Sequence, residues 1–208
     1  MTLQLALDGT LDEALRTLDV VHALVERIEI GTPLVYREGM RAVRHIRSRY
    51  GGLQLVVDLK IMDAGDEEAS IAFDAGADEV SVLALASDAT VAGVVAAARR
   101  AGGSVVADLI EAPRPVERAH RLLAAGVDLL AVHVGVDAQR ERAPFEALVT
   151  LRAALPAACL AVAGGIGPTN AARLADRAAD VVIVGGGITR SADPRAAALA
   201  IRAALGMP

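Results

Sequence analysis

The sequence of 208 residues is poor in cysteine and in aromatic side chains. Its single cysteine, Cys159, excludes an internal disulfide and any metal site built from several cysteines. Tryptophan is absent and aromatic residues make up 2% of the chain, so a core must be built from alanine, valine, leucine and isoleucine. No neighbouring residue would activate the thiol of Cys159, and we therefore expect a small buried side chain there.

The chain also lacks an excess of positive charge. Its formal net charge is −5 and its pI is near 5.4, which gives no electrostatic reason to expect nucleic acid or an anionic membrane as a partner. An anionic substrate must therefore be held by a local site. No apolar stretch reaches membrane-spanning length without interruption, and the segment MTLQLALDG has no basic region followed by a long apolar run. These absences predict a cytoplasmic chain without a signal peptide.

What the chain does have is a regular alternation of short apolar runs with longer, alanine-rich amphipathic segments. Hydrophobic residues make up 54% of the chain and the mean hydropathy is +0.44, so a sizeable core can form. The predicted strands cover residues 3–7, 27–30, 54–59, 79–83, 104–109, 129–134, 159–164 and 181–185. The predicted helices cover residues 11–26, 38–50, 66–77, 89–101, 115–126, 145–155, 170–178 and 194–205.

Eight strand–helix units in 208 residues predict an α/β protein with a (β/α)₈ TIM barrel, in a single domain spanning residues 1–208. An open doubly wound sheet also alternates strands and helices and is the alternative. The count of eight and the lack of an early glycine-rich fingerprint favour the barrel. Similar segments at residues 75–78, 125–128 and 177–180 (AGAD, AGVD and RAAD) predict a repeated turn from helix to strand.

Charged and polar residues follow the ends of the predicted strands. In a barrel, catalytic residues lie at the carboxyl ends of the strands. In chain order these ends carry Asp8, Glu29, Asp58 with Lys60, Ser81, Asp108, His133, Gly164 with Gly165, and Gly185 to Gly187. Gathering so many charges at apolar strand ends costs free energy unless they pair or bind something. The pattern predicts an active site at this end of the barrel.

Two glycine-rich turns, AVAGGIGPTN and VIVGGGITRSADP, follow the seventh and eighth predicted strands. Glycine lets backbone N–H groups approach a phosphate closely, and barrels often bind phosphate after these two strands. We therefore expect the backbone amides of Gly165, Gly185 and Gly186 to bind a phosphate group, with Arg190 as a side-chain helper. Tight turns without a ligand are the alternative.

The carboxylates after the second and third strands suit a hard cation. Mg²⁺ takes one or two carboxylates and leaves its other positions to water and substrate oxygens, and Mn²⁺ is an alternative ion. Glu29 and Asp58 are the expected ligands, and Lys60 would offset their charge and stabilise a developing enediolate. His133 lies in an otherwise apolar strand and is the candidate acid/base. A charge network that only stabilises the barrel rim is the alternative reading of this cluster.

The segment DLKIMD matches the Asp-x-Lys-x-x-Asp motif of the orotidine 5′-monophosphate decarboxylase suprafamily, at Asp58, Lys60 and Asp63. Further similar segments along nearly the whole chain are LQLALD, IEIGTPLVYREG, SDAT, VHVGVDAQ, VAGGI and VGGGIT. Within that suprafamily the chain resembles the 3-hexulose-6-phosphate synthases most, with the 3-keto-L-gulonate 6-phosphate decarboxylases as close relatives. The resemblance implies a metal-dependent aldolase that joins formaldehyde to D-ribulose 5-phosphate, reversibly, through an enediolate.

The resemblance also implies a role for each matching residue. The implied catalytic residues are Lys60, His133, Asp63, Asp108 and Asp8, the implied metal ligands are Glu29 and Asp58, and the implied phosphate-binding residues are Gly165, Gly185 and Gly186. Lys60 would support the enediolate, His133 would transfer a proton near Asp108, and Asp8 would bind substrate hydroxyls or position Lys60. Asp63 would reach the active site of the partner subunit, which implies a homodimer with shared active sites.

Four positions depart from the relatives. The decarboxylases carry an arginine, a threonine and an arginine where this chain has Val136, Ala163 and Gly186, which argues against a gulonate substrate. The synthases usually read HTGYD where this chain reads HVGVD, so Val134 and Val136 make the pocket more apolar. A decarboxylase, a non-catalytic phosphosugar-binding barrel and a phosphoribosyl isomerase are the alternative functions.

Overall fold

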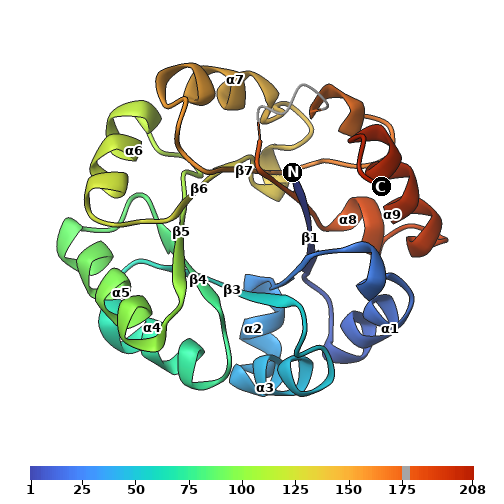
Figure 1. Cartoon of the computed structure of the whole chain (residues 1–208), viewed down its shortest axis with the longest axis horizontal. Coiled ribbons are helices and arrows are strands. Elements are labelled where there is room, and N and C mark those ends of the chain that lie inside the picture. The colour runs from blue at the N-terminus through green and yellow to red at the C-terminus, as the bar shows by residue number, and fades with distance from the viewer. Residues whose placement is uncertain (175–178) are drawn as a thin grey trace.

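Eight parallel strands close into a barrel in the computed structural model, which describes residues 1–174 and 179–208 (Figure 1). The strands are β1 Thr2–Leu7, β2 Arg27–Ile30, β3 Gln54–Ile61, β4 Glu79–Leu83, β5 Ser104–Asp108, β6 Leu129–His133, β7 Leu160–Ala163 and β8 Val181–Val184. Each strand pairs with the next one in the sequence, and β8 pairs with β1. The predicted (β/α)₈ barrel is therefore confirmed, and the open doubly wound sheet is excluded.

The helices form a ring outside the strands (Figure 1). They are α1 Leu11–Val21, α2 Thr32–Glu38, α3 Met40–Arg49, α4 Gly65–Asp74, α5 Asp88–Ala101, α6 Pro115–Ala124, α7 Phe145–Ala154, α8 Gly186–Thr189 and α9 Pro194–Ala204. The short 3₁₀ helices are η1 His22–Leu24, η2 Val136–Ala138 and η3 Ala171–Leu174. Part of the helix predicted at residues 170–178 lies outside the described residues. The sequence did not predict α2 and α8, which directly follow β2 and β8.

Side chains alternate along each strand between the outer helices and the interior of the barrel. Leu3, Leu5 and Leu7 of β1 belong to the large aliphatic core between the strands and the helices. The interior holds a smaller apolar cluster, formed by Val56, Val106, Leu129, Ala131, Ala161 and Val181. A buried ion pair joins Arg27 to Glu79 in the same interior. Because several inward side chains are alanines, room is left for a cavity toward the carboxyl ends of the strands.

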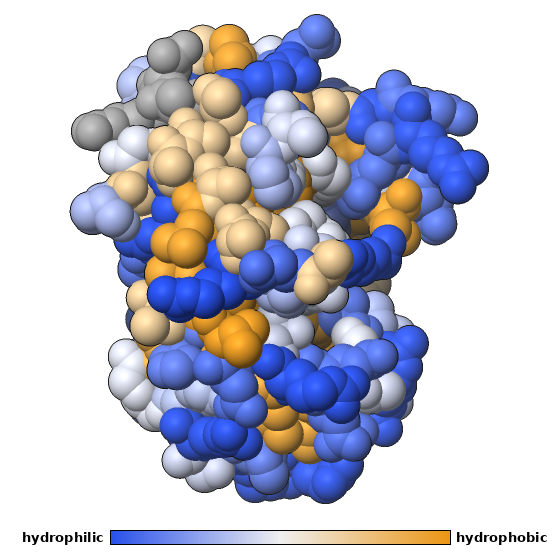
Figure 2. Space-filling model, turned by 90° about the vertical axis from the view of Figure 1, so that its right-hand side faces the viewer, coloured by the Kyte–Doolittle hydropathy of each residue, from blue (hydrophilic) through white to orange (hydrophobic). Residues whose placement is uncertain are grey.

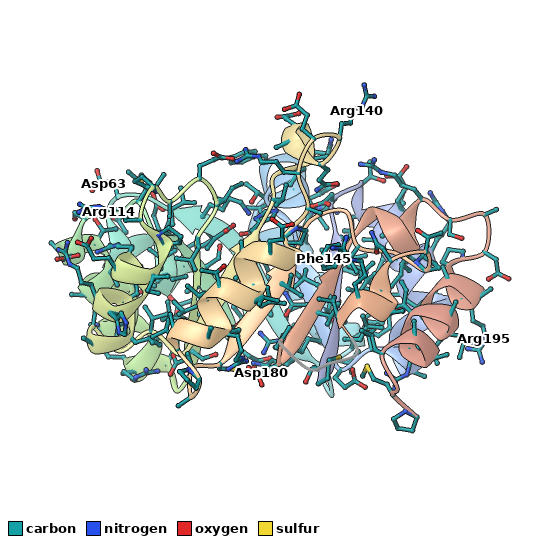
Figure 3. The ribbon with its side chains drawn as sticks, turned by 90° about the horizontal axis from the view of Figure 1, so that it is seen from above. Asp63, Arg114, Arg140, Phe145, Asp180 and Arg195 are labelled. Atoms are coloured by element: carbon teal, nitrogen blue, oxygen red, sulfur yellow. The ribbon has the colours of Figure 1, made fainter. Side chains whose placement is uncertain are left out.

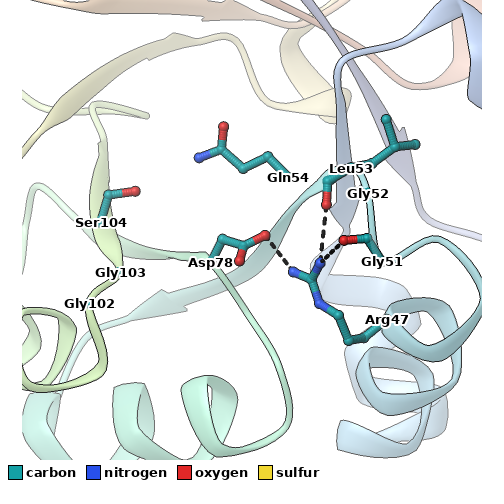
Figure 4. A pocket seen from close by; sticks show the side chains of 9 residues that line it. All are labelled: Arg47, Gly51, Gly52, Leu53, Gln54, Asp78, Gly102, Gly103 and Ser104. Carbon is teal, nitrogen blue, oxygen red and sulfur yellow. Dashed lines mark hydrogen bonds and ion pairs between the residues drawn. The ribbon is translucent and has the colours of Figure 1, made fainter.

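A hydrogen-bonded clamp recurs four times at the amino ends of the strands. An acidic side chain just before each even-numbered strand accepts a bond from a backbone N–H at the start of the preceding odd-numbered strand and pairs with a helix arginine. The four sets are Glu26 with Leu3 and Arg202, Asp78 with Leu55 and Arg47, Asp128 with Val105 and Arg99, and Asp180 with Leu160 and Arg152. Figure 4 shows Arg47 at Asp78, in an open hollow at this end of the barrel. The clamps give the recurring AGAD and AGVD segments their structural role.

We predict that Asp128→Ala lowers the free energy of unfolding by about 1–2 kcal/mol, because it removes an acceptor from Val105 N–H and from the Arg99 guanidinium. Urea denaturation measures the change. Asp74→Ala, at the exposed end of α4, is the control and should change stability by less than about 0.5 kcal/mol. An effect of Asp128→Ala no larger than that of the control would contradict the stabilising role of the clamp.

The outer surface differs from the prediction at Cys159, which is exposed rather than buried. It lies just before β7, at the amino end of the barrel, where the connections face solvent. Figure 2 shows the side that carries α1 and α9, where hydrophilic residues cover much of the surface and apolar residues such as Val20 and Leu199 lie among them. Within residues 1–174 and 179–208, no helix is long and apolar enough to cross a membrane.

Candidate active site

A cavity of about 770 Å³ opens at the carboxyl ends of the strands. Nine of the ten predicted site residues line it: Asp8, Glu29, Asp58, Lys60, Asp108, His133, Gly165, Gly185 and Gly186. The exception is Asp63. Residues from seven strands or the loops after them therefore meet at one place, as expected for a barrel whose parallel strands all end on the same side.

The ammonium group of Lys60 lies between two carboxylates. Its Nζ forms an ion pair with Asp58 and lies 3.3 Å from Oδ2 of Asp108. Burial acts to lower the pKa of Lys60, but the charges of Asp58 and Asp108 outweigh it and raise the pKa above its ordinary value. Lys60 is therefore held as a cation that faces the cavity.

Asp108 joins this group to His133. Burial acts to raise the pKa of Asp108, but the hydrogen bond from His133 and the charge of Lys60 outweigh burial, so its pKa lies below the ordinary value. Nδ1 of His133 lies 2.8 Å from Oδ2 of Asp108. Because an ionised carboxylate only accepts hydrogen bonds, Nδ1 carries the hydrogen. Nε2 is then the ring nitrogen left to exchange a proton with a substrate.

Glu29 is buried in the barrel and accepts a hydrogen bond from the amide of Gln4. Burial and the charge of Asp58 raise the pKa of Glu29 from 4.5 to about 8. Asp58 lies on the neighbouring strand, where Oδ1 accepts a bond from Ser81 at 2.6 Å and Oδ2 accepts one from Thr32 at 2.8 Å. The two carboxylates thus share a site with more negative than positive charge.

Asp8 lies at the mouth of the cavity, close to two glycines. Burial and the charge of Asp58 raise its pKa. A Cβ atom at Gly31 would collide with the carboxylate of Asp8, and one at Gly185 would lie 3.4 Å from its Oδ2. The glycine at position 31 therefore provides the space that the Asp8 side chain occupies.

The turns after β7 and β8 pack against each other along one side of the cavity. Gly164 and Gly165 have φ angles of +110° and +67°, which favour glycine. A Cβ atom at Gly187 would collide with the carbonyl oxygen of Ile166, so the second turn also requires glycine for this close approach. Arg190, which follows α8, lines the cavity as well.

Comparison with known proteins agrees with this geometry. Residues 1–201 match the model of the orotidine 5′-phosphate decarboxylase / HUMPS family. The chain belongs to this family. It is 40% identical over 207 residues to the 3-hexulose-6-phosphate synthase of Staphylococcus epidermidis, covering 99% of both chains. It is 42% identical to the crystal structure of 3-hexulose-6-phosphate synthase from Salmonella typhimurium, with a TM-score of 0.96 and coverage of 99% of this chain and 98% of that one.

A more distant family relative has been solved with a ligand. The structure of KGPDC from Streptococcus mutans in complex with a phosphosugar is 25% identical to this chain, with a TM-score of 0.92 and coverage of 99% of this chain and 97% of that one. Membership of the orotidine 5′-phosphate decarboxylase / HUMPS family confirms the resemblance drawn from DLKIMD and the other segments.

Asp63 lies outside the cavity of its own subunit. Its side chain is exposed, and Oδ1 accepts a bond of 2.8 Å from the backbone N–H of Ala64. Figure 3 shows Asp63 at the outer edge of the barrel, toward the same end as Arg140 and away from Asp180. Of the predicted site residues, this one is not brought together with the others within a single chain.

The family implies a divalent cation, and the side chains here fit Mg²⁺. In the described residues, no group of three or more histidine, cysteine or acidic side chains is placed to hold a metal. Mg²⁺ does not need such a cage, because it is often held by one or two carboxylates with water and substrate oxygens. Glu29 and Asp58 supply these two carboxylates, and the raised pKa of Glu29 marks the shortage of positive charge that a divalent ion would correct.

Three cavity residues were missed or given no role from the sequence: Gln4, Thr32 and Ser81. Gln4 could have been found, since a glutamine at an inward position of the apolar strand LQLAL requires a polar partner. Thr32 had no such signal, because α2 was not predicted. Ser81 was placed at a strand end, but its partners depend on the pairing of β3 with β4.

Proposed function

We propose that this chain is a metal-dependent aldolase of the 3-hexulose-6-phosphate synthase type, which condenses formaldehyde with D-ribulose 5-phosphate. The observation that carries the proposal is the cation of Lys60 between Asp58 and Asp108, beside His133 and facing the cavity. Relatives about 40% identical over nearly the whole chain carry the name of this synthase.

Substrate binding begins with the phosphate group. Backbone amides of Gly165, Gly185 and Gly186 would bind the phosphate on one side of the cavity, with Arg190 as a helper. The ligand complex of the Streptococcus mutans relative supports a phosphosugar ligand. Binding energy from this remote group would orient the other end of the sugar toward Lys60 and His133.

The chemical step begins at C1 of the sugar. Nε2 of His133 would remove a proton from C1, and Asp108 would hold the ring and stabilise its charged form. The resulting enediolate carries negative charge on oxygen, which the ammonium group of Lys60 stabilises. C1 then forms a bond to the carbon of formaldehyde, and the formaldehyde oxygen takes up a proton to become a hydroxyl group.

Glu29 and Asp58 would hold Mg²⁺ or Mn²⁺. When bound, such an ion polarises the oxygens of the sugar and so makes the C1 proton more acidic. Both carboxylates must be ionised to bind it, and Glu29 is the one whose ionisation is disfavoured without a cation.

This proton competition predicts that Mg²⁺ stabilises the protein more at about pH 9 than at about pH 6. The pKa of Glu29 is raised in the folded protein, so its contribution to metal-free stability is complete below 4.5 and is lost as pH rises through about 8. Differential scanning calorimetry with and without Mg²⁺ measures the shift in Tm. Glu29→Gln is the control and should remove most of the Mg²⁺ shift. A shift that is equal at both pH values, or unchanged in Glu29→Gln, would contradict this site.

The enediolate can be tested without formaldehyde. Incubation of D-ribulose 5-phosphate with the Mg²⁺-loaded protein in D₂O should place deuterium at C1, as read by NMR. A non-catalytic phosphosugar-binding barrel would bind the sugar without this exchange. Absence of exchange in folded, metal-loaded protein would count against the aldolase.

The decarboxylase alternative is less well supported by the cavity. Val136, Ala163 and Gly186 all line it, at the positions where the decarboxylase relatives carry polar side chains. The cavity therefore lacks these groups for a sugar-acid substrate. Release of CO₂ from 3-keto-L-gulonate 6-phosphate would favour the decarboxylase instead.

We also propose a homodimer in which Asp63 completes the active site of the partner subunit. Asp63 is exposed and lies outside its own cavity. Its neighbour Met62 is 51% exposed, and Leu85, which follows the adjacent strand β4, is 46% exposed. Large exposed apolar side chains of this kind are commonly buried in protein interfaces.

The assignment of residues 1–208 to one domain, and a cytoplasmic location, are further parts of this proposal. The strands from β1 to β8 span nearly the whole chain in one barrel, which supports the single domain. The composition supports the location, which fractionation of cells would test.

A further inference from the structure

The strands β3 and β4 change register beside the candidate active site. Val57 pairs with Val80, but the next pair joins Ile61 to Val82. The three residues 58–60 therefore stand opposite Ser81 alone, which makes a β-bulge. Bulges disrupt the ladder of backbone hydrogen bonds and can redirect a side chain.

Lys60 has an unusual backbone conformation in this bulge. Its φ angle is +49°, in the left-handed region that residues other than glycine rarely adopt. Such a conformation persists only where the surrounding structure holds it. The contact that holds it here is a hydrogen bond of 2.8 Å from the backbone N–H of Lys60 to the hydroxyl oxygen of Ser81.

The same hydroxyl group also binds Asp58. Ser81 donates its hydrogen to Oδ1 of Asp58 at 2.6 Å, and its side chain is buried, with the residue only 3% exposed. A serine hydroxyl has one hydrogen, so accepting from Lys60 and donating to Asp58 determines its orientation. One buried group thus contacts both the backbone of Lys60 and the carboxylate that pairs with the Lys60 ammonium.

We propose that Ser81 is a positioning residue that holds Lys60 and Asp58 in the arrangement required for turnover. Its hydroxyl stabilises the left-handed backbone of Lys60 and orients one oxygen of Asp58, so that the ammonium and the carboxylate face the cavity together. The inference rests on the proposed function, which gives Lys60 and Asp58 their roles.

Ser104 offers a matched control. Its hydroxyl donates a bond of 2.8 Å to Oε2 of Glu79, so it too joins a serine to a carboxylate inside the barrel. Ser104 lies at the first position of β5, toward the amino ends of the strands, and its hydroxyl binds Glu79 rather than Lys60 or Asp58. Ser104→Ala removes a comparable hydrogen bond at a distance from the candidate active site.

Lys60 is the only lysine in the chain, which makes the first readout specific. Labelling with [¹⁵N]lysine gives a single backbone amide signal by NMR, that of Lys60. In Ser81→Ala this amide should exchange with solvent at least about tenfold faster than in the wild type. In Ser104→Ala its exchange should be unchanged.

The second readout separates catalysis from substrate binding. Ser81→Ala should lower kcat by about 100-fold, the effect expected for a misplaced catalytic group, while KM for D-ribulose 5-phosphate changes by less than about threefold. KM should hold because the glycine turns bind the phosphate. Ser81→Thr retains the hydroxyl and should recover amide protection and most of kcat. If Ser81→Ala does not fold, Ser81→Cys, which has a weak donor and a weak acceptor, replaces it with the same expected directions.

Three results would overturn the inference. They are unchanged exchange of the Lys60 amide in Ser81→Ala, a kcat within about threefold of the wild type, and equal effects of Ser104→Ala. Failure of the proposed function is distinguishable, because wild-type protein would then convert no formaldehyde. The amide exchange of Lys60 would in that case still decide whether Ser81 holds its backbone.

Discussion

Lys60→Ala should lower kcat for the condensation by about 10³-fold or more while the barrel remains folded. The variant removes the ammonium group that lies between Asp58 and Asp108 and that would stabilise the enediolate. Steady-state kinetics measure the loss, and far-UV circular dichroism checks the fold. Activity close to that of the wild type would contradict the role of Lys60 in the chemical step.

A second variant separates the charge of Lys60 from its position. The ammonium also offsets the charge of two buried carboxylates, so Lys60→Ala should lower Tm as well as kcat. Lys60→Arg keeps the positive charge but presents a planar, bulkier group. It should recover more of the stability than of the activity. Equal recovery of both would indicate that Lys60 acts only through its charge on Asp58 and Asp108.

Asp63→Ala should lower kcat by about 100-fold, although Asp63 lies outside the cavity of its own subunit. The expected reason is that Asp63 completes the site of the partner subunit, next to the partner's phosphosugar. Sedimentation analysis of the same variant should show an unchanged dimer. A monomeric wild-type protein with full activity would contradict this arrangement.

Mixing two inactive variants tests the shared site directly. In a heterodimer of Asp63→Ala and Lys60→Ala subunits, one site contains both wild-type residues and the other contains neither. Random exchange makes half of the dimers mixed, each with one of two sites intact, so about one quarter of wild-type activity should return. The control mixes Lys60→Ala with Asp108→Ala subunits, whose altered residues both line their own cavity, and random exchange predicts no recovery there if Asp108 is as essential as Lys60. No recovery in the first mixture, despite demonstrated subunit exchange, would contradict the shared site.

Much of the barrel follows from local sequence. All eight predicted strands are confirmed, because short β-branched and leucine-rich runs between alanine-rich helices have few other ways to bury their apolar side chains. The meeting of Asp8, Glu29, Asp58, Asp108 and His133 in one cavity then follows from topology, since parallel strands in a closed barrel all end on the same side. The glycine turns after β7 and β8 could be placed for the same reason.

Other features depend on contacts between distant segments. The helix α2 is only seven residues long, and it begins where Thr32 bonds to Asp58 of the next strand. The left-handed backbone of Lys60 depends on its bond to Ser81, 21 positions away in the sequence. Local patterns carry no information about such pairs. Cys159 was misplaced for a simpler reason: residues just before a strand were assumed to be as buried as the strand itself.

The central claim is tested most directly by formaldehyde consumption in the presence of D-ribulose 5-phosphate, with and without Mg²⁺, with the product identified by mass spectrometry. The account predicts a hexulose 6-phosphate that forms only with the metal and that is lost in Lys60→Ala. No such product from folded, Mg²⁺-loaded wild-type protein would contradict it.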